Sequence, residues 1–399
     1  MSDLIRGIEA VLVDSGGRPI KQARASVIGL VGTAPEAGDS GAYAFPINTP
    51  VLVTTAKQAL QRIYNDVDGE GVDGGSLLDA LEGIFAHANS LVVMTRVAEG
   101  VTPAATATAV AGSSSARTGV YALLNAESVT GVKPKIIIAP GISTFTTGPV
   151  AATAVPAALL AVAARLKGYA IIEGPNTTNA DAISAHALPS GSRENGYFID
   201  PYVTVGTATL PASGYIAGLD VLNASERGWW TAFDNRGINA ITGTARPIDF
   251  AWGDAACDAD VLAGEHINTI IRSDGFRAWG NRTMNKTDPR FLFLTSLKIN
   301  NQIMESILIS HRWLIGQGIT RNLGVNVVNS VNTYLRSLVS NQAIYGGSCW
   351  LDPELNTEAE IALGHAYWDY DFTDVKTLER ATFRAHMVND YISNIFETA

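Results

Sequence analysis

The first half of the chain alternates short apolar runs with segments of helical spacing. Buried strands are predicted where apolar residues follow one another and end at polar or turn-forming residues. These runs are Val27–Val31, Leu91–Met94, Lys135–Ala139, Ala170–Ile172 and Tyr197–Ile199. Helices are predicted at Thr55–Tyr64, Ser76–Ala88, Val150–Leu166, Asn179–Ala187 and Ser213–Glu226. Strands that alternate with helices predict parallel βαβ units, and hence an α/β, Rossmann-like layer covered on both faces.

The last third of the chain carries longer amphipathic patterns. Two helices are predicted, each with one apolar stripe. The stripes are Ile299, Ile303, Met304, Ile307, Leu308, Leu314 and Ile315, and then Val327, Val328, Val331, Tyr334, Leu335 and Leu338. Beyond them, apolar residues alternate with polar ones on both sides of a turn at 373–377; they are Trp368, Tyr370 and Phe372, and then Ala381, Phe383, Ala385 and Met387. This predicts an antiparallel hairpin, which needs further strands because two alone are marginally stable.

These patterns divide the chain into six segments and give an α/β class, α+β overall. A lone apolar run around Ile8 ends in turn-forming residues and predicts an N-terminal arm over 1–20. Residues 98–116 are mostly Ala, Thr, Ser and Gly, which predicts a flexible surface linker. The other segments are a first α/β segment at 21–97, an α/β domain at 117–260, a C-terminal domain of helices and hairpin at 261–387, and a C-terminal arm at 388–399.

The composition indicates a globular protein, and the net charge argues against some classes of binding partner. Of 399 residues, 47% are hydrophobic and 17% charged, with a net charge of −10. The negative charge argues against binding to nucleic acid or to an anionic membrane surface. Two cysteines can form at most one bridge, which fits a reducing compartment. We find no apolar stretch of the length that a membrane span needs and no signal-peptide pattern at the start.

The charges are unevenly distributed along the chain. Segment 268–340 carries nine basic side chains and three acidic ones, a net charge of +6. Segment 341–379 carries one basic side chain and eight acidic ones, a net charge of −7. A basic segment followed by an acidic one predicts complementary contacts between copies of the chain or with an acidic partner.

Candidate catalytic motifs fail the tests that their chemistry sets. Gly38–Gly41 spells GDSG, as around the nucleophile of certain serine proteases, but there the histidine precedes the serine, and the first histidine here is His87. A glycine-rich turn is the simpler interpretation. The histidines lie at least 21 residues apart, at His87, His186, His266, His311, His365 and His386. Neither HExxH, CxxC, GxxxxGK[ST] nor a GxGxxG after a strand occurs, so we predict no metal and no cofactor.

Two further groups of residues, four carboxylates and a pair of tryptophans, have both a functional and a structural interpretation. Four carboxylates near the ends of βαβ elements could form an acid–base pair, but caps and solvated charges are the simpler interpretation. They are Asp200, Asp220, Glu226 and Asp234. Trp229 and Trp230 could stack on a sugar or a base, but packing between domains, together with Phe233 and Trp252, explains them more simply. We therefore predict no catalytic residue.

Several stretches resemble one family in the same order along nearly the whole chain. They are Arg96–Gly100, Arg117–Leu124, Gly131–Lys135, Ile271–Thr283, Trp368–Phe372 and Leu378–Arg384. The most specific is Ile271–Thr283, which reads IRSDGFRAWGNRT. With these stretches the chain resembles the tail sheath proteins of contractile bacteriophages and of R-type bacteriocins.

The resemblance implies a structural protein and not an enzyme. Sheath subunits stack in hexameric rings around a tail tube, and on a baseplate signal the sheath shortens and drives the tube through a bacterial envelope to deliver a genome or bacteriocin. The implied partners are further copies of the chain, the tail tube protein, and the baseplate and tail terminator proteins. The implied location is the virion tail, after assembly in the host cytoplasm. The family's middle domain is often described as subtilisin-like, but we recognise no catalytic triad here.

The resemblance also implies roles for particular residues. The terminal arms of this family donate strands to neighbouring subunits. Their expected anchors here are Ile5, Ile8, Val11, Val13, Tyr391, Ile392, Ile395 and Phe396, although the last four, with Val388, have helical spacing. The hairpin expected to accept neighbouring strands contains Trp368, Tyr370, Phe372 and Phe383.

The basic segment is the expected source of contacts with the tube. The second predicted helix leaves Arg321, Asn329, Asn332 and Arg336 outward. Arg321 and Arg336 are separated by about 60° around the helix axis, so both can face one partner. The alternative, which we weigh equally, is that both arginines are solvated or pair with the acidic segment of a neighbour.

Two alternative functions stay open. One is the sheath of a type VI secretion system, which usually consists of two different chains; a single chain with both arms argues against it. The other is an enzyme on the Rossmann-like layer, for which the nucleotide-binding loop is missing.

Overall fold

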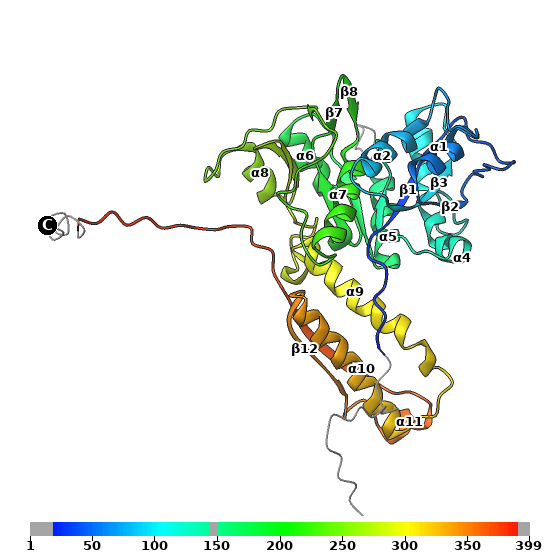
Figure 1. The fold of residues 1–399 in the computed structure, drawn as a ribbon, viewed down its shortest axis with the longest axis vertical. Helices are drawn as coiled ribbons and strands as arrows, with labels where there is room; N and C mark the ends of the chain where they lie inside the picture. The colour runs from blue at the N-terminus through cyan, green and yellow to red at the C-terminus, as the bar shows by residue number, and fades with distance from the viewer. Residues whose placement is uncertain (1–18, 144–150, 390–399) are drawn as a thin grey trace, which may run out of the picture.

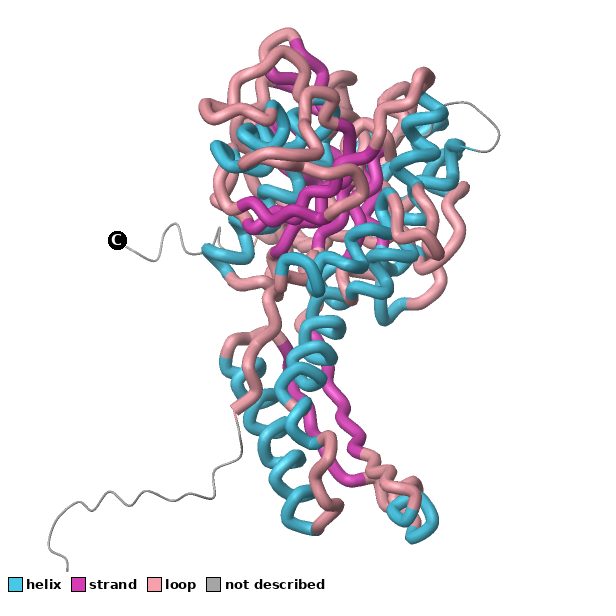
Figure 2. The backbone as a smooth tube through the Cα atoms, turned by 90° about the vertical axis from the view of Figure 1, so that its right-hand side faces the viewer, coloured by secondary structure: helices cyan, strands magenta, loops and turns pink. Residues whose placement is uncertain are grey.

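The computed structural model describes residues 19–143 and 151–389. They form a large α/β lobe and a slender lower lobe, with the long helix α9 (Leu294–Ser310) running from one into the other (Figures 1 and 2). No helix within these residues is long and apolar enough to cross a bilayer. The predicted arm anchors at 5–13 and 391–396 lie outside the described residues.

A six-stranded sheet forms the centre of the α/β lobe. Its order is β2 (Pro50–Val53), β3 (Leu91–Val97), β1 (Val27–Thr33), β4 (Ile136–Ile138), β5 (Tyr169–Glu173) and β6 (Gly196–Ile199). All neighbours are parallel except β2, which is antiparallel to β3. The five predicted strands are confirmed, because strands buried on both faces are continuous apolar runs. Strand β2 escaped prediction because it is short and half-buried.

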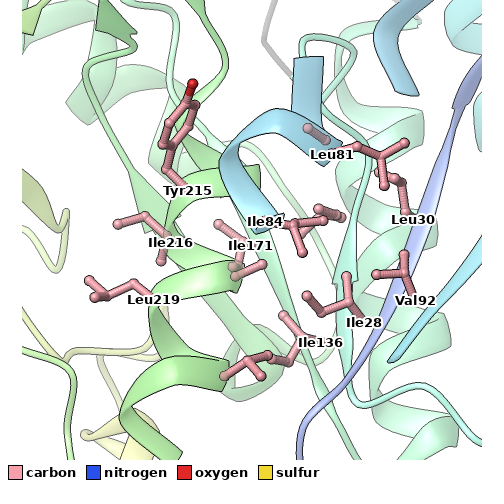
Figure 3. Close-up of a cluster of buried hydrophobic side chains, with 14 of the residues drawn as sticks. Ile28, Leu30, Leu81, Ile84, Val92, Ile136, Ile171, Tyr215, Ile216 and Leu219 are labelled. Atoms are coloured by element: carbon pink, nitrogen blue, oxygen red, sulfur yellow. The ribbon is translucent and has the colours of Figure 1, made fainter. Parts of the chain in front are cut away.

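Helices cover both faces of this sheet, as predicted. On one face, α2 (Gly75–Phe85) and α7 (Ala212–Arg227) pack on a core that includes Ile28, Ile136 and Ile171 (Figure 3). On the other, α3 (Pro103–Ala111) and α5 (Ala151–Leu166) contribute to a second core. The remaining helices of this lobe include α1 (Ala56–Tyr64), α4 (Ala126–Thr130), α6 (Asn179–Ala187) and α8 (Asp258–Gly264).

Residues 98–116 contain helix α3 where we predicted a flexible linker. The helix begins after Thr102, whose Oγ1 accepts the Ala105 N–H at 3.2 Å, and its Val110 is fully buried in the second core. Its small side chains allow the helix to pack closely against the sheet, so it can be partly buried without large apolar residues. The sheet also continues across this segment, since β1 pairs with both β3 and β4. The segments 21–97 and 117–260 therefore share one sheet.

Beyond β6 the α/β lobe carries two small antiparallel sheets. One has the order β8 (Ala208–Leu210), β7 (Val203–Val205) and β9 (Gly243–Thr244). The other is the hairpin of β10 (Thr269–Arg272) and β11 (Phe276–Trp279). Residues 271–279 of this hairpin form the first part of the stretch at 271–283 that carried the family resemblance.

The lower lobe packs two helices on a two-stranded sheet. Helix α10 (Arg321–Ser340) begins after Thr320, whose Oγ1 accepts the Leu323 N–H at 3.2 Å. It packs against α9 and against the sheet of β12 (Ile344–Leu351) and β13 (Trp368–Asp374), with α11 (Glu358–Ala362) at the tip (Figure 1). Both predicted amphipathic helices are confirmed, although α9 ends at Ser310 and a 3₁₀ turn, η4 (Arg312–Leu314), follows it.

The predicted hairpin is wrong in its pairing. Strand β13 pairs with β12, with Cys349 opposite Tyr370, and not with 381–387. Strand β12 was missed because Gly346-Gly347-Ser348 interrupts its apolar pattern. Residues 380–388 have no regular secondary structure and project from the body (Figure 1), with Phe383 almost fully exposed. Their alternation is therefore not explained by a contact in their own subunit.

Candidate functional surfaces

The GDSG sequence at Gly38–Gly41 forms a turn. The Asp39 carboxylate pairs with Arg96, whose guanidinium also donates to the Ala37 carbonyl. Ser40 is exposed. Both ring nitrogens of His87 form hydrogen bonds with residues other than Ser40. Nδ1 donates to Gly83 O at 2.8 Å, and Nε2 accepts the Asn239 N–H at 3.0 Å. Desolvation lowers the pKa of His87. These contacts support the turn interpretation.

The four carboxylates that we considered as acid–base candidates each have separate partners. Glu226 pairs with Arg236 at the surface, and Asp234 accepts the Gly280 N–H at 2.8 Å. Asp200 and Asp220 differ from the predicted caps and solvated charges, because both are buried in ion pairs, with Arg246 and Lys298 respectively. Burial raises the pKa of Asp200 despite the arginine. The described residues contain no cluster of three metal-ligating side chains.

The three tryptophans considered above lie in two different places. Trp229 is buried in the apolar cluster of α9 and α10, and its ring meets that of Trp230 edge-on at 5.5 Å. Packing between the lobes therefore explains this pair. Trp252 is largely exposed and instead contacts Phe250 and Trp279, with ring centroids at 4.9 and 5.7 Å.

The outer edge of β13 presents main-chain groups that β12 does not use. The Cys349 N–H donates to Asn332 Oδ1 at 2.8 Å, and the Cys349 C=O accepts from Asn332 Nδ2 at 3.0 Å. Opposite residues of an antiparallel pair either bond to each other or both point away. The N–H and C=O of Tyr370, opposite Cys349, therefore point away from β12, as do those of Trp368 and Phe372. No other strand of the described chain pairs along this edge.

The two faces of the β12–β13 sheet differ in chemistry. Trp368, Tyr370 and Phe372 pack toward α10, in the cluster with Leu335. Alternate side chains of a strand point to opposite faces, so Asp369 and Asp371 lie on the other face. The exposed Trp350, opposite Asp369, shares that outer face.

Residues 380–388 form an extended, exposed segment with two different sides. Phe383, Ala385 and Met387 alternate with Arg384 and His386, and all of them are exposed. A segment with this alternation has one apolar and one basic side when it is extended.

Arg321 and Arg336 lie on the exposed face of α10, as predicted. Arg336 donates to Thr333 Oγ1 at 3.0 Å within the helix, and Asn329 is also exposed. Asn332 was predicted to point outward, but it is turned to β12 and bonds the main chain of Cys349.

Two buried ion pairs join α9 to the α/β lobe, and sequence analysis missed them. Lys298 Nζ lies 2.6 Å from Asp220 Oδ1, and Tyr169 Oη donates to the same carboxylate at 2.7 Å. About two helical turns later, Glu305 pairs with Lys135 and, at 2.8 Å, with Lys133. Burial lowers the pKa of Lys135 to about 8. The spacing of seven residues, which places Lys298 and Glu305 on one helical face, was the available signal.

Family models match two consecutive parts of the chain. Residues 115–284 match the model of the phage tail sheath protein central domain, and residues 286–388 match the phage tail sheath C-terminal domain. A prophage protein of Pseudomonas aeruginosa, named as a major tail sheath protein, is 34% identical over 98% of this chain and 99% of its own length. The tail sheath protein of Escherichia phage P2 is 30% identical over 99% of this chain and 98% of its own length.

Solved structures of low sequence identity share the fold. The sheath of an extracellular contractile injection system, PVC, in its contracted state has a TM-score of 0.68 at 14% identity, covering 98% of this chain and 99% of that one. The contracted helical sheath of the anti-feeding prophage has a TM-score of 0.67 at 17% identity, covering 97% of this chain and all of that one.

Proposed function

The chain belongs to the phage tail sheath family, and from this premise we propose that it is the structural subunit of a contractile tail sheath. In this role it polymerises around a tail tube and shortens to drive the tube through a bacterial envelope. The observation that carries the proposal is the match to tail sheath proteins over nearly the full length of both chains. The proposed place of the protein is the virion tail, after assembly in the host cytoplasm.

Self-assembly by strand exchange is the mechanism that the lower lobe supports best. Segment 380–388 is extended and has no partner among the described residues of its own subunit, while β13 has an open edge. A donated strand satisfies main-chain groups along such an edge without specific side chains. We assign Trp368, Tyr370 and Phe372 to the accepting sheet. Phe383, which was expected on the accepting hairpin, belongs to the donated segment because it lies beyond β13 in the projecting chain.

The two sides of the donated segment match the two faces of the accepting sheet. With Phe383, Ala385 and Met387 toward α10, the strand extends the apolar layer of Tyr370 and Phe372. Arg384 and His386 then lie on the face of Asp369 and Asp371, where opposite charges on neighbouring strands attract. This arrangement fixes which side of the incoming strand faces the core.

The other proposed contacts are with the tube and the two ends of the tail. Arg321 and Arg336 on the exposed face of α10 are the proposed tube contacts. Many modest electrostatic contacts allow a sheath to hold the tube and later release it. The baseplate and the tail terminator protein are the proposed partners at the ends of the polymer. We assign no catalytic activity, and no observation favours the type VI or enzymatic alternatives.

Deletion of 380–399 tests the strand exchange. Wild-type protein expressed alone should form long polymers in negative-stain images. The shortened protein should remain folded and monomeric, because 380–388 contribute no buried side chain to their own subunit. Circular dichroism and sedimentation would measure both properties. Long polymers of the shortened protein would contradict strand exchange, and wild-type protein that never polymerises would contradict the sheath function.

A further inference from the structure

Helix α9 buries an unusual number of polar side chains. Six of its ten buried residues are polar: Thr295, Ser296, Asn301, Gln302, Glu305 and Ser306. Buried polar groups normally need hydrogen-bond partners. The partners of several lie in chain segments that lead directly to the two arms.

The segment that leads to the N-terminal arm, around residues 21–23, is bound along α9 by a series of side-chain hydrogen bonds. The Ala23 N–H donates to Ser306 Oγ at 3.1 Å, and Gln302 Nε2 donates to the Ala23 carbonyl. One turn further, Ser310 Oγ accepts the Lys21 N–H at 2.9 Å and donates to the Lys21 carbonyl at 3.3 Å. Gln302, Ser306 and Ser310 are four residues apart, so they form one row on the helix. Figure 1 shows this segment descending beside α9.

The segment that leads to the C-terminal arm is held at the start of the same helix. Thr377 Oγ1 lies 3.0 Å from Thr295 Oγ1 and accepts from Asn281 Nδ2 at 2.9 Å. Ser296 Oγ donates to the Asp374 carboxylate. Two residues beyond Thr377, Glu379 forms a bidentate ion pair with Arg282. Arg282 Nε donates to Glu379 Oε1 at 2.6 Å, and Arg282 Nη2 donates to Glu379 Oε2 at 2.8 Å.

Residues 380–389 are exposed, so the Glu379–Arg282 ion pair marks the place where the C-terminal segment leaves the body of the subunit. Asn281 and Arg282 belong to the family-like stretch at 271–283, and Glu379 belongs to the one at 378–384. The structure therefore joins these two stretches through Arg282 and Glu379, which are 97 positions apart in the sequence.

The two α9 residues that pair with the α/β lobe lie among these attachments, with Lys298 between the two and Glu305 within the N-terminal row. Along α9 the order is Thr295 and Ser296 for the C-terminal segment, Lys298 for Asp220, Gln302 for the N-terminal segment, and Glu305 for Lys133 and Lys135. Ser306 and Ser310 complete the N-terminal row. One helix thus holds both arm roots and the charged contacts to the larger lobe.

We propose that α9 is the common anchor of both arms, and that its polar side chains are positioning residues for assembly. They fix where each arm leaves the subunit and connect both departure points to the α/β lobe through Lys298 and Glu305. The inference rests on the proposed function, because it assigns the arms to neighbouring copies.

The double variant Ser306→Ala, Ser310→Ala tests the N-terminal attachment in the full-length protein. Both substitutions remove only hydroxyl groups, and Ser337→Ala on α10 is the matched control because its Oγ donates within its own helix. Hydrogen exchange should accelerate about tenfold in the peptide covering residues 19–25, since the N–H groups of Lys21 and Ala23 lose their acceptors. The amount of sedimenting polymer should fall, and the control should match wild type in both measurements.

The variant Thr295→Val tests the C-terminal attachment to α9 independently, because it removes the hydroxyl that contacts Thr377 Oγ1. It also keeps the proposal testable if the serine variant misfolds. Thr333→Val on α10 is its control, because Thr333 is exposed and its Oγ1 donates within its own helix. Exchange should accelerate in residues 376–380, and polymer should decrease.

Each outcome has a defined meaning. Faster exchange with unchanged polymer in both variants would overturn the role in assembly while leaving the sheath function standing. Unchanged exchange in both would overturn the anchor itself. Failure of wild-type protein to polymerise would instead count against the proposed function.

Discussion

Lys298 and Asp220 form a buried ion pair between the lobes, with Nζ 2.6 Å from Oδ1 and both side chains less than 10% exposed. Lys298 comes from α9 and Asp220 from α7, so the pair couples the lower lobe to the helix layer of the main sheet. Charges buried in this way are tolerated because each is the partner of the other.

Removing one member of this pair should be costly. Lys298→Met leaves the Asp220 carboxylate buried with only the Tyr169 hydroxyl as a partner, and we expect a loss of about 3–5 kcal/mol in the free energy of unfolding. Arg236→Met, which breaks an exposed pair with Glu226, should cost less than about 1 kcal/mol. Urea unfolding of the two variants measures the difference. Equal losses would contradict the structural importance of the buried pair.

Lys135 should make stability depend on pH in the alkaline range. Burial lowers its pKa from 10.5 to about 8 in the folded protein. Between these values the unfolded chain binds a proton that the folded protein lacks, so the contribution of this group to stability rises with pH and is lost as pH falls through 8. Urea midpoints between pH 8 and 10 should therefore rise more steeply in wild type than in Lys135→Met. Parallel profiles would contradict the lowered pKa.

The arginines of α10 should matter for the tube and not for contacts between sheath subunits. Arg321→Glu with Arg336→Glu should leave sheath-only polymers intact and prevent assembly on purified tubes. Wild-type assembly on tubes should weaken with added salt, because exposed charges are screened. Lys57→Glu with Arg165→Glu, exposed on α1 and α5, is the matched control. Normal coating of tubes by the α10 variant would place the tube contact elsewhere.

The packing of α7 on α2 depends on glycine. A Cβ added at Gly214 would lie 2.6 Å from the Ala80 carbonyl oxygen, and one at Gly218 would lie 2.8 Å from that of Ile84. Alanine normally stabilises a helix interior relative to glycine, but here Gly214→Ala should reduce the free energy of unfolding by about 1–3 kcal/mol through overpacking. Gly237→Ala, where nothing lies within 4 Å, should be close to neutral. Thermal unfolding would show whether Gly214→Ala instead stabilises the protein.

Sequence patterns predicted the parts of the fold whose burial is local. Strands such as β1 and β5 are buried along their whole length because helices cover both of their faces, so a run of mostly apolar residues reveals them. Alternation at 381–387 correctly indicated an extended segment with two unlike sides, but alternation does not specify the partner. Pairing with β13 was therefore assigned to the wrong segment, while β12 was hidden by Gly346 and Gly347.

Sequence patterns could not predict which polar residues of α9 are buried. The isoleucines of this helix form a recognisable stripe, whereas the burial of Gln302 and Ser306 depends on main-chain groups some 280 residues away. Lys298 likewise pairs with a residue 78 positions away. A polar residue in a sequence is expected at the surface by default, and only the fold shows which ones are covered.

The rigidity of α9 has a geometric consequence for a polymer. An α-helix rises 1.5 Å per residue, so Thr295 and Ser310 are separated by about 22 Å along the axis. The hydrogen-bonded helix keeps that spacing under load. If each arm joins a different neighbour, every subunit is a link of fixed length between its two connections. A lattice of such links changes its height and width through the angles at which the links meet, as a lattice of hinged rods does, while the rods themselves keep their length.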